Sequence, residues 1–158
     1  MNFRIVLLLL FSPFCMFGQN ISSTGNWSYN VPASTISEAG NNYNGNISSN
    51  VNQTLLDLAG MGFYTTYRVD VRHSGTLPAP LTLQVMRTGD GVKSGFGGIS
   101  GGTAYQNVTN SNIQFFTGWN FLGGTYMNVP IQYNLTGVSV LIPAGSYATT
   151  VTYTIIAI

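Results

Sequence analysis

The stretch that decides the fold is FYTTYRVDVRH, residues 63–73, because its second half alternates strictly between apolar and charged side chains. The apolar positions are Tyr67, Val69 and Val71. The charged positions are Arg68, Asp70 and Arg72. A repeat of two residues is typical of a β-strand with one face on a core and the other in solvent. We therefore expect a half-buried strand here, with its charged side chains in water.

Similar alternation occurs along most of the chain and predicts an all-β protein. The other segments with a strand pattern are 26–32, 80–88, 112–119, 129–143 with a break near Gly137, and 147–158. Residues 52–60 fit either a short helix or a strand with Leu56 and Leu58 on one face. The Gly- and Asn-rich segments 37–50 and 89–102 are expected to be loops, with a tight turn at Asp90–Gly91. Together these signals predict an Ig-like antiparallel β-sandwich of about seven to nine strands.

Residues 1–18 have the three parts of a secretory signal peptide. Arg4 supplies the basic start, residues 5–11 form a short apolar run, and Gly18 offers a small residue before cleavage. The apolar run is too short for a membrane-spanning helix. We expect a secreted or cell-surface protein whose single mature domain is residues 19–158, with no membrane span after the signal is removed.

Cys15 is the only cysteine of the chain. Phe14 and Ser12 do not match the small residue and the leucine that precede a lipidated cysteine in bacterial lipoproteins, which favours loss of Cys15 with the signal. Lipidation stays open as the alternative. Without Cys15 the mature chain has no thiol for a disulfide or for a metal site.

Charge is sparse and balanced in the expected mature domain. The chain has five basic residues, one of them Arg4, so four remain against four acidic residues. This balance lacks the positive field of a nucleic-acid-binding protein and of a polybasic membrane patch. A nearly neutral polar surface favours association between copies of a protein.

Residues that carry catalysis are nearly absent. His73 is the only histidine, no serine lies in a G-x-S-x-G pattern, and a single imidazole cannot build a zinc site. Residues 89–102 fail both the phosphate-loop and the dinucleotide-binding spacing. We therefore expect no enzyme, no cofactor and no metal. A pair of acids brought together from different segments is left open.

Aromatic residues suggest a carbohydrate-binding alternative. Exposed Trp and Tyr rings beside Asn can stack on a sugar and bind its hydroxyl groups, although most aromatic residues of a sandwich fill its core. The first candidates are Tyr105 and Trp119, which lie near Gly and Asn. Six Asn-x-Ser/Thr triplets mark surface positions and leave glycosylation open.

The last segment combines strand alternation with an apolar end. One face carries Tyr147, Val151, Tyr153 and Ile155, and the other ends in Ile156 and Ile158. The first face is mostly apolar, so an apolar pair at the end of the second, threonine-rich face indicates that this strand is covered, either by its own domain or by a neighbouring subunit.

IPAGSYATTVTYTI, residues 142–155, resembles the closing hairpin of spore-coat-U-type and secreted pilin-type subunits. The resemblance implies an Ig-like sandwich that is completed by a strand from the next subunit. This chain lacks the cysteine pair of those subunits and does not end on an aromatic residue.

These observations predict a non-catalytic structural or surface subunit, similar to a pilin or coat protein, whose partners are copies of itself or related subunits. The alternative is a carbohydrate-binding or adhesin module. The residues expected at the interacting edges are Trp27, Tyr29, Val31, Tyr147, Val151, Tyr153, Ile155, Ile156 and Ile158.

Overall fold

The computed structural model describes residues 18–32, 42–43 and 45–158, and this part of the chain is all-β, as predicted. It contains eight strands in one antiparallel network and no helix. The strands are β1 (Asn20–Thr24), β2 (Asn46–Ser48), β3 (Thr54–Ser74), β4 (Thr82–Arg87), β5 (Val92–Ser100), β6 (Gln106–Asn107), β7 (Ile113–Thr136) and β8 (Thr150–Ala157). The predicted signal peptide lies outside the described residues except for Gly18.

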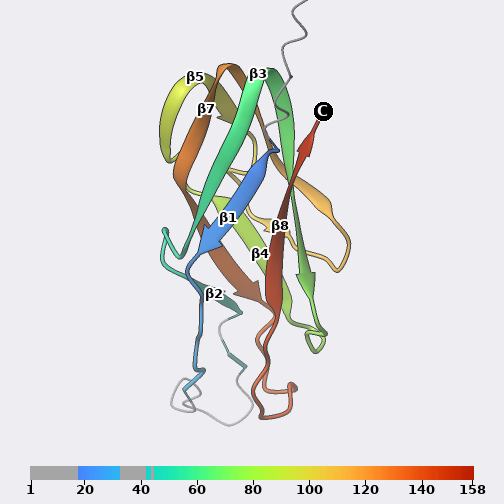
Figure 1. Ribbon diagram of the computed structural model, residues 1–158. Coiled ribbons are helices and arrows are strands. Elements are labelled where there is room, and N and C mark those ends of the chain that lie inside the picture. Colours follow the sequence, from blue (N-terminus) through green and yellow to red (C-terminus); the bar gives the residue numbers. More distant parts are fainter. Residues whose placement is uncertain (1–17, 33–41, 44) are drawn as a thin grey trace, which may run out of the picture.

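Two long strands, β3 and β7, form the spine of the fold. They pair from Thr54 opposite Ile131 to Val71 opposite Ile113. Their register shifts twice between Leu56 and Met61, and Gly60 there has a φ of 73°. Register shifts and left-handed glycines let a long strand bend. The spine therefore bends over at one end of the molecule, at the top of Figure 1.

The shorter strands flank this spine. β1 pairs with residues 55–59 of β3, and β8 pairs with residues 67–74 of the same strand. β2, β4 and β5 pair with β7, and β6 pairs with β4. Because β3 bends between its two partners, β1 and β8 come to lie side by side and run in opposite directions (Figure 1).

The core is built from residues of β3, β4 and β7, most of them at alternate positions. Its fully buried side chains on β3 are Leu56, Leu58, Tyr67, Val69 and Val71. Those that complete it from β4 and β7 are Leu83, Val85, Phe115, Phe116, Tyr126, Val129, Ile131 and Tyr133. Burial of one such side chain stabilises the fold by about 1.5–3 kcal/mol. The structure confirms the strand alternative for residues 54–60 and the predicted inward faces of β3 and β4.

The prediction of a first strand at residues 26–32 is wrong. The strand is β1, at Asn20–Thr24, and residues 25–32 have no regular structure. Gly25 ends β1 with a φ of 105°, in a place where a Cβ atom would collide with the carbonyl oxygen of Gln53. Beyond this turn the ring of Trp27 stacks on that of Tyr133, with centroids 6.2 Å apart. Trp27 is therefore a residue that packs against the core, not part of an alternating strand.

The glycine-rich segment 89–102 contains a strand where a loop was predicted. β5 lies along β7, with Gly97 opposite Asn120 and Gly98 opposite Trp119. A Cβ at Gly97 would collide with the Asn120 side chain, and one at Gly98 would lie 3.0 Å from the Trp119 indole nitrogen. An aromatic ring opposite a glycine covers backbone that the glycine leaves bare. The glycines of β5 therefore serve packing. The predicted turn at Asp90–Gly91 falls in the connection between β4 and β5, where Gly91 has a φ of 70°.

Residues 113–119 and 129–136 belong to the single strand β7. This strand ends beside Gly137, where a break was predicted, but residues 137–143 form no second strand. Within the predicted loop 37–50, residues 46–48 form β2, whereas 37–41 and 44 lie outside the described residues.

Asp70 is buried, so the expectation of a fully solvent-exposed charged face on β3 is wrong for this residue. It lies between Gln114 of β7 and Thr154 of β8, which cover it from both sides. Its carboxylate pairs with the Arg68 guanidinium, with 2.7 Å between Nε and Oδ1.

Candidate functional site

The terminal strand β8 leaves one of its edges open. Its register with β3 has no shift, and the Ile158 amide donates a hydrogen bond to the Thr66 carbonyl at 3.1 Å. In a regular antiparallel pair, alternate residues direct their backbone groups toward the partner strand. The even-numbered residues of β8 therefore face β3. Val151, Tyr153 and Ile155 direct their backbone N–H and C=O groups away from it.

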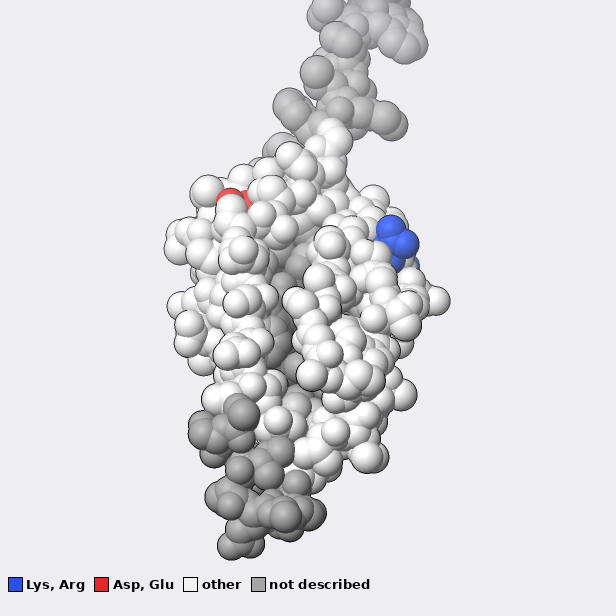
Figure 2. Space-filling model, turned by 90° about the horizontal axis from the view of Figure 1, so that it is seen from below, with Lys and Arg blue, Asp and Glu red and all other residues white. Residues whose placement is uncertain are grey.

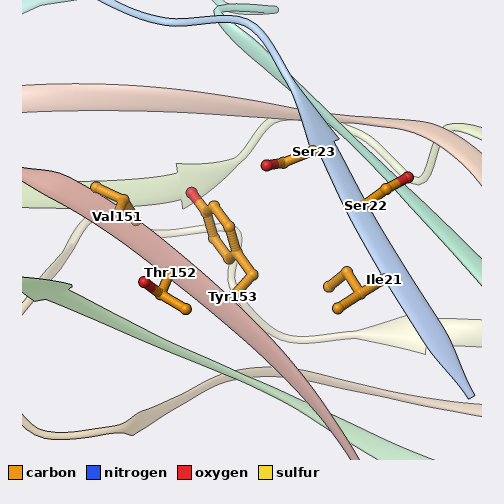
Figure 3. A pocket seen from close by; sticks show the side chains of 6 residues that line it. All are labelled: Ile21, Ser22, Ser23, Val151, Thr152 and Tyr153. Carbon is orange, nitrogen blue, oxygen red and sulfur yellow. The ribbon is translucent and has the colours of Figure 1, made fainter.

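β1 lies across from this edge, and the two strands enclose a shallow groove of about 170 Å³. We call it the edge groove. The residues that line it are Ile21, Ser22, Ser23, Val151, Thr152 and Tyr153. Ile21, Ser23 and Tyr153 point into the space between the strands, whereas Ser22 points away from it (Figure 3). Among the strands that the structure describes, β1 and β8 each pair with β3 and with no other.

The side chains of β8 hold the strand onto its own domain. Val151, Tyr153 and Ile155 are half-buried and pack against the core. The Tyr153 hydroxyl shares a hydrogen bond with the Tyr133 hydroxyl at 3.0 Å, and Tyr133 also donates to Thr54 Oγ1 at 3.0 Å. Burial raises the pKa of Tyr153, and the neighbouring Tyr133 phenol adds to this rise. A partner at this edge would therefore meet mainly the backbone of β8.

The other residues predicted at the edges lie elsewhere. The segment from Trp27 to Val31 supplies no strand, and Tyr29 is exposed. Tyr147 precedes β8, and its hydroxyl donates to the Pro143 carbonyl at 2.6 Å. Ile156 is half-buried, and Ile158 is 63% exposed where its backbone meets Thr66.

A second surface lies where the spine bends, and we call it the apolar tip. Its members are Phe63, Tyr64, Phe96, Trp119, Phe121 and Leu122, which are between 38% and 73% exposed. Phe63 pairs with Leu122 across the two strands. The rings of Tyr64 and Phe121 meet edge to face, with centroids 4.3 Å apart. Phe96 lies between Gly95 and Gly97 of β5, which pair with Gly124 and Asn120.

The sequence prediction missed most of this tip. It singled out Trp119 and Tyr105, but only Trp119 belongs to the tip. Tyr105 lies between β5 and β6, at the β4 side of the fold. The available signal was two pairs of adjacent large apolar residues, at 63–64 and 121–122, each beside glycines that allow a bend.

The single histidine, His73, makes no ion pair with an acidic side chain among the described residues. His73 lies beside a depression lined by residues 75–77, 81–83 and 108–110, none of which is acidic. The contact of its Nδ1 is with the Thr149 hydroxyl, at 3.4 Å. Within the described ranges, no three His, Cys, Asp or Glu side chains come close enough to hold a metal ion.

Charged side chains are few on the surface as well. Seen from below, the molecule has only small separate charged spots and a furrow along the middle of this face (Figure 2). The described part of the chain contains no helix that is long and apolar enough to cross a membrane.

Comparisons with protein-family models, with curated proteins and with solved structures found no match.

Proposed function

We propose that this chain is a non-catalytic structural subunit of the cell surface or the extracellular space. It associates with copies of itself or with related subunits by adding a β-strand at the edge groove. The observation that carries this proposal is the pair of open strand edges, β1 and β8, that face each other across the groove. An exposed edge is a template for pairing with another chain.

The composition of these two strands supports this function. Proteins that stay monomeric protect their edges with charged residues, prolines or bulges. β1 reads NISST and β8 reads TVTYTIIA, so neither contains a charge or a proline. Their pairing with β3 also has no register shift. Both edges therefore lack the common devices against strand addition.

The proposal includes export by the signal peptide of residues 1–18 and a two-layer Ig-like arrangement. In this arrangement the bend of the spine places β1 and β8 in different layers. It is supported by the burial of β3 on both sides of the bend, with Leu56 and Leu58 before it and Val69 and Val71 after it. The ring contact between Phe115 of β7 and Tyr153 of β8, at 6.1 Å, fits the same packing.

Sedimentation velocity of residues 19–158 over a range of concentrations tests the proposal, with one substitution on each face of β1. Ser23→Lys places a charge in the groove, and Ser22→Lys places the same charge on the other face (Figure 3). Both positions are exposed, so both variants should fold. We expect wild type and Ser22→Lys to associate alike. Ser23→Lys should associate about tenfold more weakly, since only its charge projects into the groove where the partner strand would pair.

A wild-type chain that stays monomeric at every concentration would contradict the proposal. Equal association of the two lysine variants would contradict the role of the groove. Circular dichroism of both variants is the control for folding.

The second candidate is a carbohydrate-binding module, which one observation favours. The Trp119 indole lies across Gly98 and is 48% exposed, and an exposed aromatic ring can stack on a sugar. A glycan array separates the two functions. Saturable binding that Trp119→Ala abolishes and Tyr105→Ala preserves would favour the module.

A further inference from the structure

The apolar tip has no charge of its own and almost none near it. All 24 residues of β7 are uncharged. In β3 no charged residue occurs between Asp57 and Arg68. Lys93 is the one charged residue of β5, and its ammonium group donates to the Gly97 carbonyl at 2.7 Å, beside the tip. A cluster of exposed large apolar side chains without charge marks an interaction site for a protein or a membrane.

The shape of the tip favours a membrane. Phe63 pairs with Leu122, and the neighbouring residues Tyr64 and Phe121 form a second pair. Both pairs lie on the bend of the spine, which forms one end of the molecule (Figure 1). Large apolar side chains at the end of a molecule can enter a bilayer together, without a partner of complementary shape.

The residue types fit the same environment. Trp and Tyr are enriched at the interface between membrane and water because their rings are apolar and carry a polar group. The tip combines Trp119 and Tyr64 with Phe and Leu side chains. Between Asp57 and Arg68 of β3 and throughout β7, no acidic group is present that lipid phosphates would repel.

The chain itself connects an apolar segment to this end. The described structure begins at Gly18, whose carbonyl oxygen lies against Gly60, three residues before Phe63. The residues just before it are the apolar Phe17 and Met16, preceded by the apolar run of residues 5–11. The chain before residue 18 therefore joins the domain beside the bend.

We propose that the apolar tip docks on a lipid bilayer, with Phe63, Tyr64, Phe121 and Leu122 entering the interface and Trp119 at its edge. The interaction is hydrophobic and needs little anionic lipid, because Lys93 is the one nearby cation. It involves none of the residues that line the edge groove. The site therefore goes beyond the proposed self-association and does not depend on it.

Vesicle flotation of residues 19–158 tests this site, with vesicles of phosphatidylcholine alone or mixed with phosphatidylglycerol. We expect the wild-type chain to float with both, with affinities that differ by no more than about fivefold. The double variant Phe63→Ser/Leu122→Ser should lose about tenfold in affinity, because binding scales with buried apolar area. Leu141→Ser is the matched control, since Leu141 is 85% exposed but follows β7 at a distance from the bend.

Trp119 reports where the chain meets the lipid. In a Trp27→Phe background, its fluorescence should shift to the blue on vesicle binding and be quenched by brominated lipid. Unchanged fluorescence together with flotation would place the contact elsewhere and overturn the proposal. The absence of flotation would also overturn the proposal, as would an equal loss of vesicle affinity in the double variant and in Leu141→Ser. Dimers that form without lipid and require the tip residues would overturn it as well.

The Ser23→Lys variant separates this test from that of the proposed function. It should float like the wild-type chain even where its self-association is weakened. Failure of self-association alone would leave the membrane site standing, and failure of flotation alone would leave the edge groove standing.

Discussion

Tyr67 shows how tightly single residues are fitted at the centre of this protein. Its ring is fully buried, and its hydroxyl lies close to the Tyr126 phenol. Both polar atoms of the Asn120 amide are buried without a hydrogen-bond partner among the described residues. Gly118 lies directly opposite Tyr67, where a Cβ would collide with the phenol ring. Burial raises the pKa of Tyr67 well above 10, and the nearby Tyr126 phenol adds to this rise.

We expect Gly118→Ala to lower the free energy of unfolding by about 2–3 kcal/mol, because the added methyl group overpacks a filled site. Gly62→Ala is the matched control on the paired strand. Its Cβ would meet only Thr65 Cγ2, at an ordinary 3.7 Å, so we expect a change within about 0.5 kcal/mol. Urea unfolding of both variants measures the difference. Equal stability of the two would mean that Tyr67 does not occupy this position.

Arg87 organises the connection between β4 and β5. Its side chain is buried at 4% exposure and pairs with Asp90. It donates to the Gly101 carbonyl from Nη2 at 2.9 Å and to the Gly89 carbonyl from Nη1 at 2.9 Å. The guanidinium also lies 5.8 Å from the centre of the Phe116 ring. One side chain thus ties both ends of the glycine-rich strand β5 to the core.

Arg87→Leu should destabilise the fold by about 2–4 kcal/mol, because it leaves carbonyl groups and Asp90 without their partner. Arg72→Leu removes an exposed arginine from β3 and should change stability by no more than about 0.5 kcal/mol. Thermal or urea unfolding compares the two variants. A small effect at Arg87 would show that water replaces its hydrogen bonds.

The terminal strand β8 both packs on the core and carries one of the open edges. β8 covers Val69 and Val71 of β3 through its pairing with residues 67–74. Removing residues 154–158 would uncover part of the core. Weaker association of such a truncated chain could then result from loss of folding as well as from loss of the interface. Substitutions at Ser22 and Ser23 leave this cover in place and so test the edge itself.

At the scale of the whole molecule, three tyrosines that lie in the core or pack against it link stability to alkaline pH. Burial is the largest cause that raises the pKa of Tyr67, Tyr126 and Tyr153 above the ordinary value of 10.0. The unfolded chain therefore loses these protons at lower pH than the folded chain. Their contribution to stability is complete below pH 10 and falls as the pH rises above it.

We expect the free energy of unfolding to be lower at pH 11 than at pH 9, because only the unfolded state ionises these three phenols readily at pH 11. Absorbance at 295 nm should show their ionisation in one step that coincides with loss of the circular dichroism signal. Full ionisation of all nine tyrosines in a protein that stays folded would contradict this linkage.

The sequence by itself determined the all-β class, because alternation with a period of two is a local property that residues 63–73 and 150–157 display without their neighbours. It also located the core faces of β3 and β4, since Leu56, Val69 and Val85 lie where that period places them. It misplaced β1 and missed β5, because Trp27 and the glycines of β5 are placed by packing against segments distant in the chain. The edge groove and the apolar tip were decided only by the tertiary structure. Both depend on where β3 bends and which strands it brings together, and these contacts join residues far apart in the chain.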